Sequence, residues 1–225
     1  MKARLRNTGV LKSTMWITWR HRDTDITWPP PTIEEKVEIF YERALGWQLH
    51  IADLVANGGH PLGTACSVNR LEHSDFAVLQ ICLSYFETVG HYQGPPKPPD
   101  GKTKKEKEGY FFKEGVRAVF PRLLADCGEA VEGLLDRLYV GARCGLYHNS
   151  LTVPGVGVGK PPGDAPIAYD PDSRCLAIST KRLTGALKRH LEEFRTQLLD
   201  RGNVELRHNF ERRFNEDNGI PGGQA

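Results

Sequence analysis

Residues 131–149 read VEGLLDRLYVGARCGLYHN. The apolar side chains in this stretch recur at spacings of three and four, which predicts an amphipathic helix from about Gly128 to Asn149. The residues of this seam are Val131, Leu135, Leu138, Ala142 and Leu146. Glu132, Asp136 and Arg137 can occupy the polar faces. A helix with one apolar face must pack against other elements, so the stretch indicates a helical bundle.

Three more helices are predicted before this stretch. The first begins after Thr32, a favourable N-cap residue, and continues to Asn57-Gly58-Gly59, where it ends. The second is expected from about Asp75 to Gly90, with Phe76, Leu79, Leu83 and Phe86 on one face. The third is shorter, from about Glu108 to Leu124, with an interruption near Pro121.

After residue 150 the pattern changes. Residues 166–169 and 175–178, separated by Asp170-Pro171-Asp172-Ser173, predict a small β-hairpin. A long helix is expected from about Thr180 to Asp200, and a charged tail with Phe210 and Phe214 closes the chain. The predicted fold class is therefore mainly α, with a small β-hairpin and an additional C-terminal helix.

The domain organisation follows from these elements. Residues 1–31 mix charged and aromatic residues without a clear period and end in three prolines, so they are interpreted as an N-terminal extension. Residues 32–150 form the helical bundle, which includes a proline- and lysine-rich loop, predicted to be mobile, at about residues 92–107. Residues 151–225 supply the hairpin and a helix that packs on the bundle.

Composition limits the class of protein. The chain has 225 residues and a formal net charge of +2, so a nucleic-acid partner would require a local concentration of positive charge. Its five cysteines are odd in number and widely spaced, which supports neither a disulfide framework nor a zinc ribbon. No segment has the length of apolar sequence that a signal peptide or a membrane span needs. We therefore expect a cytoplasmic protein that does not enter a membrane.

Motifs for cofactors and metals are not supported. Gly155-Val156-Gly157-Val158-Gly159-Lys160 has some likeness to a phosphate-binding loop, but Pro154 and Pro161 stand where that motif needs glycine and a hydroxyl residue. We interpret it as a flexible loop. The eight histidines are scattered along the sequence, so we expect no metal site and no cofactor.

The sequence around Arg143 and His148 carries the strongest functional signal. The two residues form an Arg-x4-His pair within Arg-Cys-Gly-Leu-Tyr-His, at the end of the amphipathic helix. This pattern resembles the HEPN superfamily, whose nucleases carry Arg-x(4–6)-His in the last core helix of a four-helix bundle. The resemblance implies an antiparallel four-helix HEPN-like bundle at about residues 32–150. It also implies Arg143 and His148 as catalytic residues.

The residue types suit RNA cleavage. A guanidinium binds two phosphate oxygens in a bidentate manner, and an imidazole transfers protons near neutral pH. RNA supplies its own nucleophile, the 2′-hydroxyl, so a metal ion is not strictly required. One histidine cannot act as base and acid at once, whereas two copies in a homodimer could supply both. HEPN nucleases are understood to work through such paired motifs and to leave a 2′,3′-cyclic phosphate and a 5′-hydroxyl.

The expected function is therefore a metal-independent endoribonuclease that acts on RNA as a homodimer through the Arg143/His148 helix. The resemblance implies a toxin or phage-defence role, with an antitoxin or defence-system partner. The alternative is a non-catalytic HEPN-like module that binds a nucleotide, RNA or a partner protein. It is favoured by Cys144, because many active members have a polar residue directly after the arginine. A third possibility is a purely structural domain, in which Arg143 forms an ion pair and His148 caps a helix.

Several weaker site residues accompany this pair. Asn149 and Tyr147 could orient His148 or bind RNA, although a helix cap and a half-buried aromatic residue are the simpler interpretations. Lys102, Lys104 and Lys105 could form a basic arm for the RNA backbone. Gly145 leaves the helix surface thin between Arg143 and His148, which suits the close approach of a ligand or of a partner, or merely tight helix packing.

Overall fold

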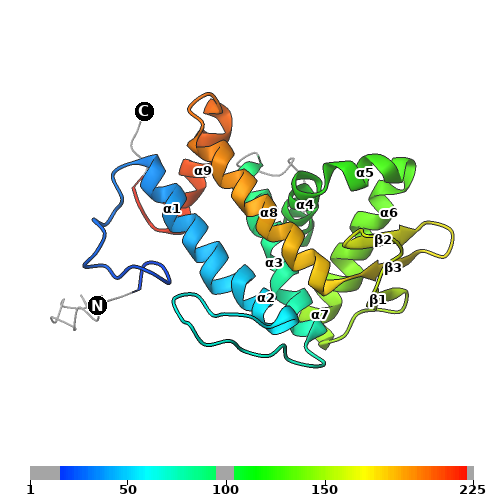
Figure 1. The fold of residues 1–225 in the computed structure, drawn as a ribbon. Helices are drawn as coiled ribbons and strands as arrows, with labels where there is room; N and C mark the ends of the chain where they lie inside the picture. The colour runs from blue at the N-terminus through cyan, green and yellow to red at the C-terminus, as the bar shows by residue number, and fades with distance from the viewer. Residues whose placement is uncertain (1–15, 95–103, 222–225) are drawn as a thin grey trace, which may run out of the picture.

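The computed structural model describes residues 16–94 and 104–221 of the chain, which is mainly helical with a small sheet (Figure 1). The first long helix consists of α1 (Ile33–Ala44), the π-helical segment η1 (Leu45–Leu49) and α2 (His50–Asn57). Thr32 and Glu35 form a reciprocal capping box at its start, because each side chain accepts a hydrogen bond from the other residue's backbone N–H. Gly46, within η1, has no side chain because the indole of Trp19 lies against it.

Helix α3 (Asp75–Gln93) lies at the centre of the molecule and contacts α2, α4, α8 and α9. It crosses α4 (Lys104–Val119) at two glycines, Gly90 and Gly115, so the two backbones touch. The loop expected at residues 92–107 is therefore too long at both ends. The helical hydrogen bonding of α3 continues to Gln93, and α4 already begins at Lys104.

The segment from residue 121 to residue 149 is helical but not uniform. It consists of α5 (Pro121–Cys127), the 3-10 turn η2 (Gly128–Ala130), α6 (Val131–Asp136), the π-helix η3 (Arg137–Cys144) and α7 (Gly145–Asn149). A helix from Gly128 to Asn149 was correctly expected, but its π-helical part was not. The carbonyl of Gly141 in this part accepts a hydrogen bond of 3.0 Å from the N–H of Val153 in the following loop.

The sheet has three strands, β1 (Val156–Val158), β2 (Ile167–Asp170) and β3 (Cys175–Ile178), in the order β1-β3-β2. The antiparallel pair β2–β3 confirms the predicted hairpin, with Ile167 opposite Ile178. The interpretation of residues 155–160 as a flexible loop is wrong for β1, which pairs with β3 in parallel. The alternation of valine and glycine fits this strand, because buried Val156 packs on the helix and Gly157 faces out.

Two helices close the described chain, α8 (Thr180–Leu199) and α9 (Val204–Asp217). The charged tail expected after residue 200 is therefore wrong as a description of α9. Phe210 and Phe214 are buried in the core, and the charged residues of α9 reach α1, where Arg207 pairs with Glu34 at 2.9 Å. Figure 1 shows α9 beside the first turns of α1.

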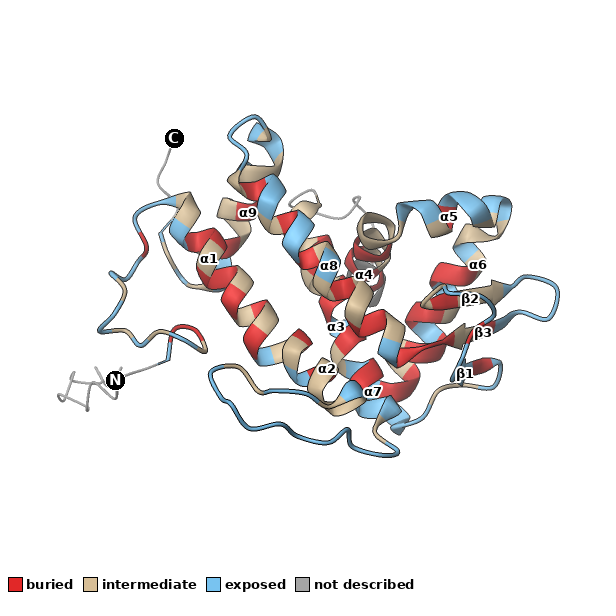
Figure 2. Cartoon of the chain, viewed as in Figure 1, coloured by how far each residue is buried: buried red, intermediate tan, exposed pale blue. Residues whose placement is uncertain are grey.

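One hydrophobic core joins all of these elements. It extends from Ile17, in the segment before α1, to Phe214 in α9, and includes the inner side chains of the sheet. Figure 2 shows buried residues along the inner faces of α1, α8 and α6, whereas the loop of residues 58–74 is mostly exposed. Within residues 16–94 and 104–221, no helix has the length and apolar character that crossing a membrane requires.

The pair of Tyr85 on α3, which is fully buried, and His190 on α8, which is half-buried, is expected to make stability depend on pH. The hydroxyl of Tyr85 lies 3.0 Å from Nδ1 of His190, and burial lowers the pKa of His190 to about 4. In the unfolded chain this pKa is about 6.5, so the unfolded state binds a proton that the folded state excludes. The contribution of His190 to the free energy of unfolding is therefore fully present above pH 6.5, falls as the pH is lowered from 6.5, and is lost once the pH has fallen through 4.

We expect this single group to lower the free energy of unfolding by at most about 3 kcal/mol between pH 6.5 and 4. His190→Gln should show a smaller fall than the wild type over the same range. Urea unfolding at a series of pH values measures how the free energy of unfolding of each protein changes with pH. Parallel curves for the two proteins would mean that His190 is freely protonated in the folded state.

Candidate functional site

Arg143, near the end of η3, is anchored to the central helix. Its Nη2 lies 3.0 Å from Oε2 of Glu87 on α3, and the two side chains are 22% and 23% exposed. Burial alone would lower the pKa of Arg143, but the hydrogen bond and the negative charge of Glu87 outweigh burial and raise it. The guanidinium is therefore protonated at neutral pH, and the ion pair with Glu87 fixes its position.

Tyr147 connects Arg143 to His148. The guanidinium carbon of Arg143 lies 5.0 Å from the centre of the Tyr147 ring, within cation–π range. The rings of Tyr147 and His148 meet edge to face, with centroids 5.2 Å apart and planes at 88°. Tyr147 is 65% exposed and His148 is also exposed. We call Arg143, Tyr147 and His148 the helix-end site.

The helix-end site links the two residues expected to be catalytic only through Tyr147, because within the described residues no hydrogen bond, ion pair or ring contact joins Arg143 directly to His148. In a regular α-helix, five residues turn the side-chain direction by about 140°. This geometry applies only from Gly145 onward, because Arg143 and Cys144 belong to the π-helix. The side chain of Tyr147, which was expected to be half-buried if merely structural, instead lies at the surface between the other two.

Gly145 serves packing within the chain. A Cβ at this position would lie 2.7 Å from the carbonyl oxygen of Leu151, because the loop after α7 turns back against the helix. The glycine therefore does not leave room for a ligand or for a second molecule. Of the two interpretations given to Gly145, tight packing is the one that the coordinates support.

The neighbours of the site have smaller roles. Asn149 is exposed and ends α7, and the C-cap is Ser150, which adopts the left-handed conformation at φ 57°. The cap is therefore supplied by neither Asn149 nor His148. Cys144 is half-buried and packs against the core.

The predicted basic arm lies largely outside the described residues. Lys102 belongs to the undescribed segment, and Lys104 and Lys105 form the first residues of α4, with side chains outside the described part. Their contact with RNA stays a prediction.

Sequence reasoning missed Glu87. Its signal was present, because Glu87 is the one acidic residue of α3 after Asp75, on a helix that is otherwise largely apolar. A lone carboxylate in such a helix requires a cationic partner or solvent. The sequence alone could not show that this partner is Arg143.

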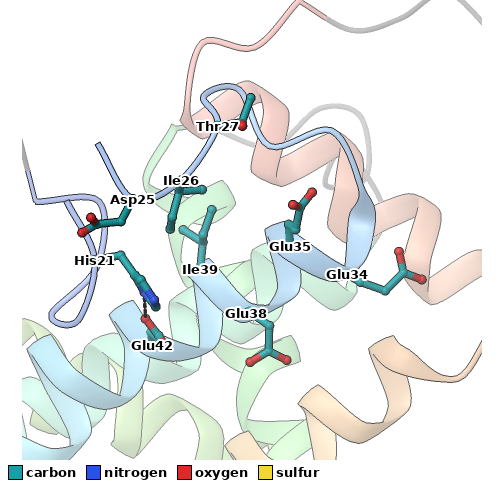
Figure 3. A pocket seen from close by; sticks show the side chains of 9 residues that line it. All are labelled: His21, Asp25, Ile26, Thr27, Glu34, Glu35, Glu38, Ile39 and Glu42. Carbon is teal, nitrogen blue, oxygen red and sulfur yellow. Dashed lines mark hydrogen bonds and ion pairs between the residues drawn. The ribbon is translucent and has the colours of Figure 1, made fainter. Parts of the chain in front are cut away.

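A second candidate region lies between residues 21–27 and α1, around a cavity of about 390 Å³ (Figure 3). Carboxylates line it, but they point in different directions and have their own partners. Glu34 pairs with Arg207, Glu38 pairs with Arg195, and Glu42 accepts a hydrogen bond of 3.0 Å from His21. In the part of the chain that the structure describes, no group of His, Cys, Asp and Glu could hold a metal ion.

Comparison of the chain with protein-family models, with curated proteins and with solved structures finds no match. The chemistry of the helix-end site therefore has to support any assignment of function.

Proposed function

We propose that the protein is a metal-independent endoribonuclease of the HEPN type, with Arg143 and His148 as catalytic residues. The observation that carries the proposal is the continuous contact of a charged guanidinium, an exposed phenol and an exposed imidazole at one helix end. Glu87 accepts a hydrogen bond from Nη2 of Arg143, and no other hydrogen bond of this guanidinium occurs within the described residues, so we assign its remaining N–H donors to phosphate oxygens.

The reaction balances without an added co-reactant. The 2′-hydroxyl of RNA gives its proton to one imidazole and attacks the adjacent phosphorus. The bond from phosphorus to the 5′-oxygen breaks, and a second, protonated imidazole gives a proton to that leaving oxygen. The products are a 2′,3′-cyclic phosphate and a 5′-hydroxyl. Arg143 stabilises the charge that develops on the phosphorane oxygens.

The second imidazole would come from another copy of the chain, as in a homodimer formed through the Arg143/His148 helix. Two apolar side chains at the helix-end site and directly after it are exposed and favour such an interface. They are Tyr147 at 65% and Leu151 at 58%. A toxin or phage-defence context, with an antitoxin or defence partner, belongs to the same proposal.

A second candidate function is a HEPN-like module that binds RNA or a partner without cleavage. It is favoured by the ion pair of Arg143 with Glu87 and by Cys144, which places a half-buried thiol where a polar neighbour would assist catalysis. In this version Arg143 and Tyr147 bind the RNA backbone and His148 transfers no proton.

The test is incubation of the purified protein with RNA in EDTA, followed by analysis of the product ends. We expect 2′,3′-cyclic phosphate and 5′-hydroxyl ends. His148→Ala should lower the cleavage rate at least about a hundredfold, because general acid–base catalysis supplies roughly that much. Its melting temperature should stay near that of the wild type, since the side chain is exposed.

The matched control is His208→Ala, which removes an exposed histidine of α9 far along the sequence from the site. It should leave cleavage unchanged. RNA binding without cleavage by the wild type would reject the nuclease and support the binding module. If His208→Ala and His148→Ala lose the same activity, the measured cleavage does not come from the helix-end site.

A further inference from the structure

A cavity of about 700 Å³ lies between the α6–η3 helix and the β2–β3 hairpin. Its polar lining consists of Glu129, Asp136, Arg137, Tyr169 and Arg174. None of these residues belongs to the helix-end site. The volume falls within the range of small-molecule sites, which is about 300–1,000 Å³. Figure 1 shows the hairpin beside α6, where this cavity lies.

Two arginines belong to the lining of the cavity. A Cβ placed on Gly155 would lie 3.5 Å from Nη2 of Arg137 and 3.5 Å from the backbone carbonyl oxygen of Arg174, so the Arg137 guanidinium lies near the backbone of Arg174. Arg137 donates a long hydrogen bond of 3.4 Å to the carbonyl of Pro154. Within residues 16–94 and 104–221, neither guanidinium forms an ion pair with a carboxylate. Two arginines without a carboxylate partner in the lining of one cavity suit an anion, and phosphate above all.

The backbone of Arg174 adds a second observation. Arg174 has φ 54°, in the left-handed region, at the end of the turn between β2 and β3. Glycine adopts this conformation without a steric cost, whereas arginine does not. The side chain is exposed, and no hydrogen bond of its guanidinium occurs within the described residues. Within the described residues, no hydrogen bond or ion pair of the Arg174 side chain therefore stabilises the fold.

The other end of the cavity has a different chemistry. Glu129 lies in the 3-10 turn η2, eight residues before Arg137 at the start of η3. Its carboxylate can accept hydrogen bonds from amino groups of a ligand. Asp136 pairs with Lys113, whose Nζ lies 2.6 Å from Oδ1 of Asp136 and 3.6 Å from Oε2 of Glu132, and this pair reduces the repulsion between Asp136 and an anion. Between the two ends, Tyr169, Val140 and Val153 offer an aromatic ring and apolar surface.

We propose that this cavity binds a nucleoside monophosphate. Arg137 and Arg174 hold the phosphate, Tyr169 and the valines contact the base, and Glu129 accepts a hydrogen bond from an exocyclic amino group. The proposal does not depend on RNA cleavage at the helix-end site. A nucleoside monophosphate has a negative phosphate at one end and a base with amino groups at the other. These two ends match the arginines and the Glu129 carboxylate of the cavity.

Isothermal titration calorimetry at low salt tests the proposal with AMP, adenosine and inorganic phosphate as probes. We expect AMP to bind more tightly than either of the other two. Arg137→Ala and Arg174→Gly should each weaken AMP binding at least tenfold, because each removes a charge-assisted contact. Arg189→Ala, at an exposed position of α8, is the matched control and should bind AMP like the wild type.

The Arg174→Gly variant separates binding from folding. Its melting temperature should equal or exceed that of the wild type, because glycine relieves the left-handed backbone. Unchanged AMP binding by both arginine variants would overturn the proposal, as would inorganic phosphate that binds as tightly as AMP. His148→Ala should bind AMP like the wild type. The AMP result therefore tests the cavity even if the protein does not cleave RNA.

Discussion

Gly115→Ala is expected to disrupt the central helix crossing and to destabilise the protein by about 4 kcal/mol or more. A Cβ at this position would lie 1.7 Å from the carbonyl oxygen of Phe86 and 3.0 Å from the backbone nitrogen of Gly90. These are backbone atoms, so no side chain can rotate away. The helices α3 and α4 would have to separate and pull apart the buried Phe86 and Phe112 rings, whose centroids are 5.6 Å apart.

Thermal unfolding followed by circular dichroism measures this effect. The melting temperature should fall by about 10 °C or more, given 2–4 °C per kcal/mol in chains of this size. The control is Gly185→Ala on α8, where the nearest atom to the new methyl is the end of the Arg189 side chain at 3.6 Å. That variant should be neutral or slightly more stable, because alanine is the better helix former. If Gly115→Ala and Gly185→Ala have the same melting temperature, α3 and α4 do not cross as closely as described.

Phe210→Ala is expected to cost 3–5 kcal/mol, the usual range for removing a large buried aromatic residue. Phe210 is fully buried and lies at the centre of an aromatic cluster. The ring centroids of Phe40 and Tyr92 lie 5.5 Å and 5.3 Å from its own, and Phe194 is 6.5 Å away. The substitution would leave a cavity where α1, α3, α8 and α9 meet.

Chemical denaturation gives the free energy of unfolding for this variant and for a matched control. Val204→Ala, at the start of the same helix, removes a side chain that is 72% exposed and should change stability by less than about 0.5 kcal/mol. A Phe210→Ala protein as stable as the Val204→Ala protein would mean that α9 does not dock on the core.

Much of the fold could be predicted because apolar periodicity is strong in most helices. Of the predicted seam, Leu135, Leu138, Ala142 and Leu146 are buried as expected, and Val131 is half-buried. Helix α9 was missed because its apolar stripe is narrow, with Leu206, Phe210 and Phe214 among many charges. Those charges suggested a solvated tail, whereas two of them, Arg207 and Glu211, pair with Glu34 and Lys36 of α1. Local sequence contains no information about such distant partners.

The candidate site could be predicted only in part. The positions of Arg143 and His148 near one helix end followed from their spacing, but the π-helix did not, because the apolar spacing of the sequence fits an ordinary α-helix. Glu87 and the cavity arginines Arg137 and Arg174 required tertiary structure, since their partners come from other elements. The left-handed conformation of Arg174 was also invisible, because arginine gives no signal for it.

The pairing of α1 with α9 has a consequence for biosynthesis. Glu34 pairs with Arg207, and Arg43 donates a hydrogen bond of 2.8 Å to Asn218, in contacts that join residues 173 and 175 positions apart. A nascent chain that has produced α1 and α3 therefore exposes Phe40 and its apolar neighbours until residues 204–217 have left the ribosome. Contacts of such long sequence separation form late and slowly. During this interval the nascent chain exposes hydrophobic surface that chaperones can bind and that can aggregate with other nascent chains.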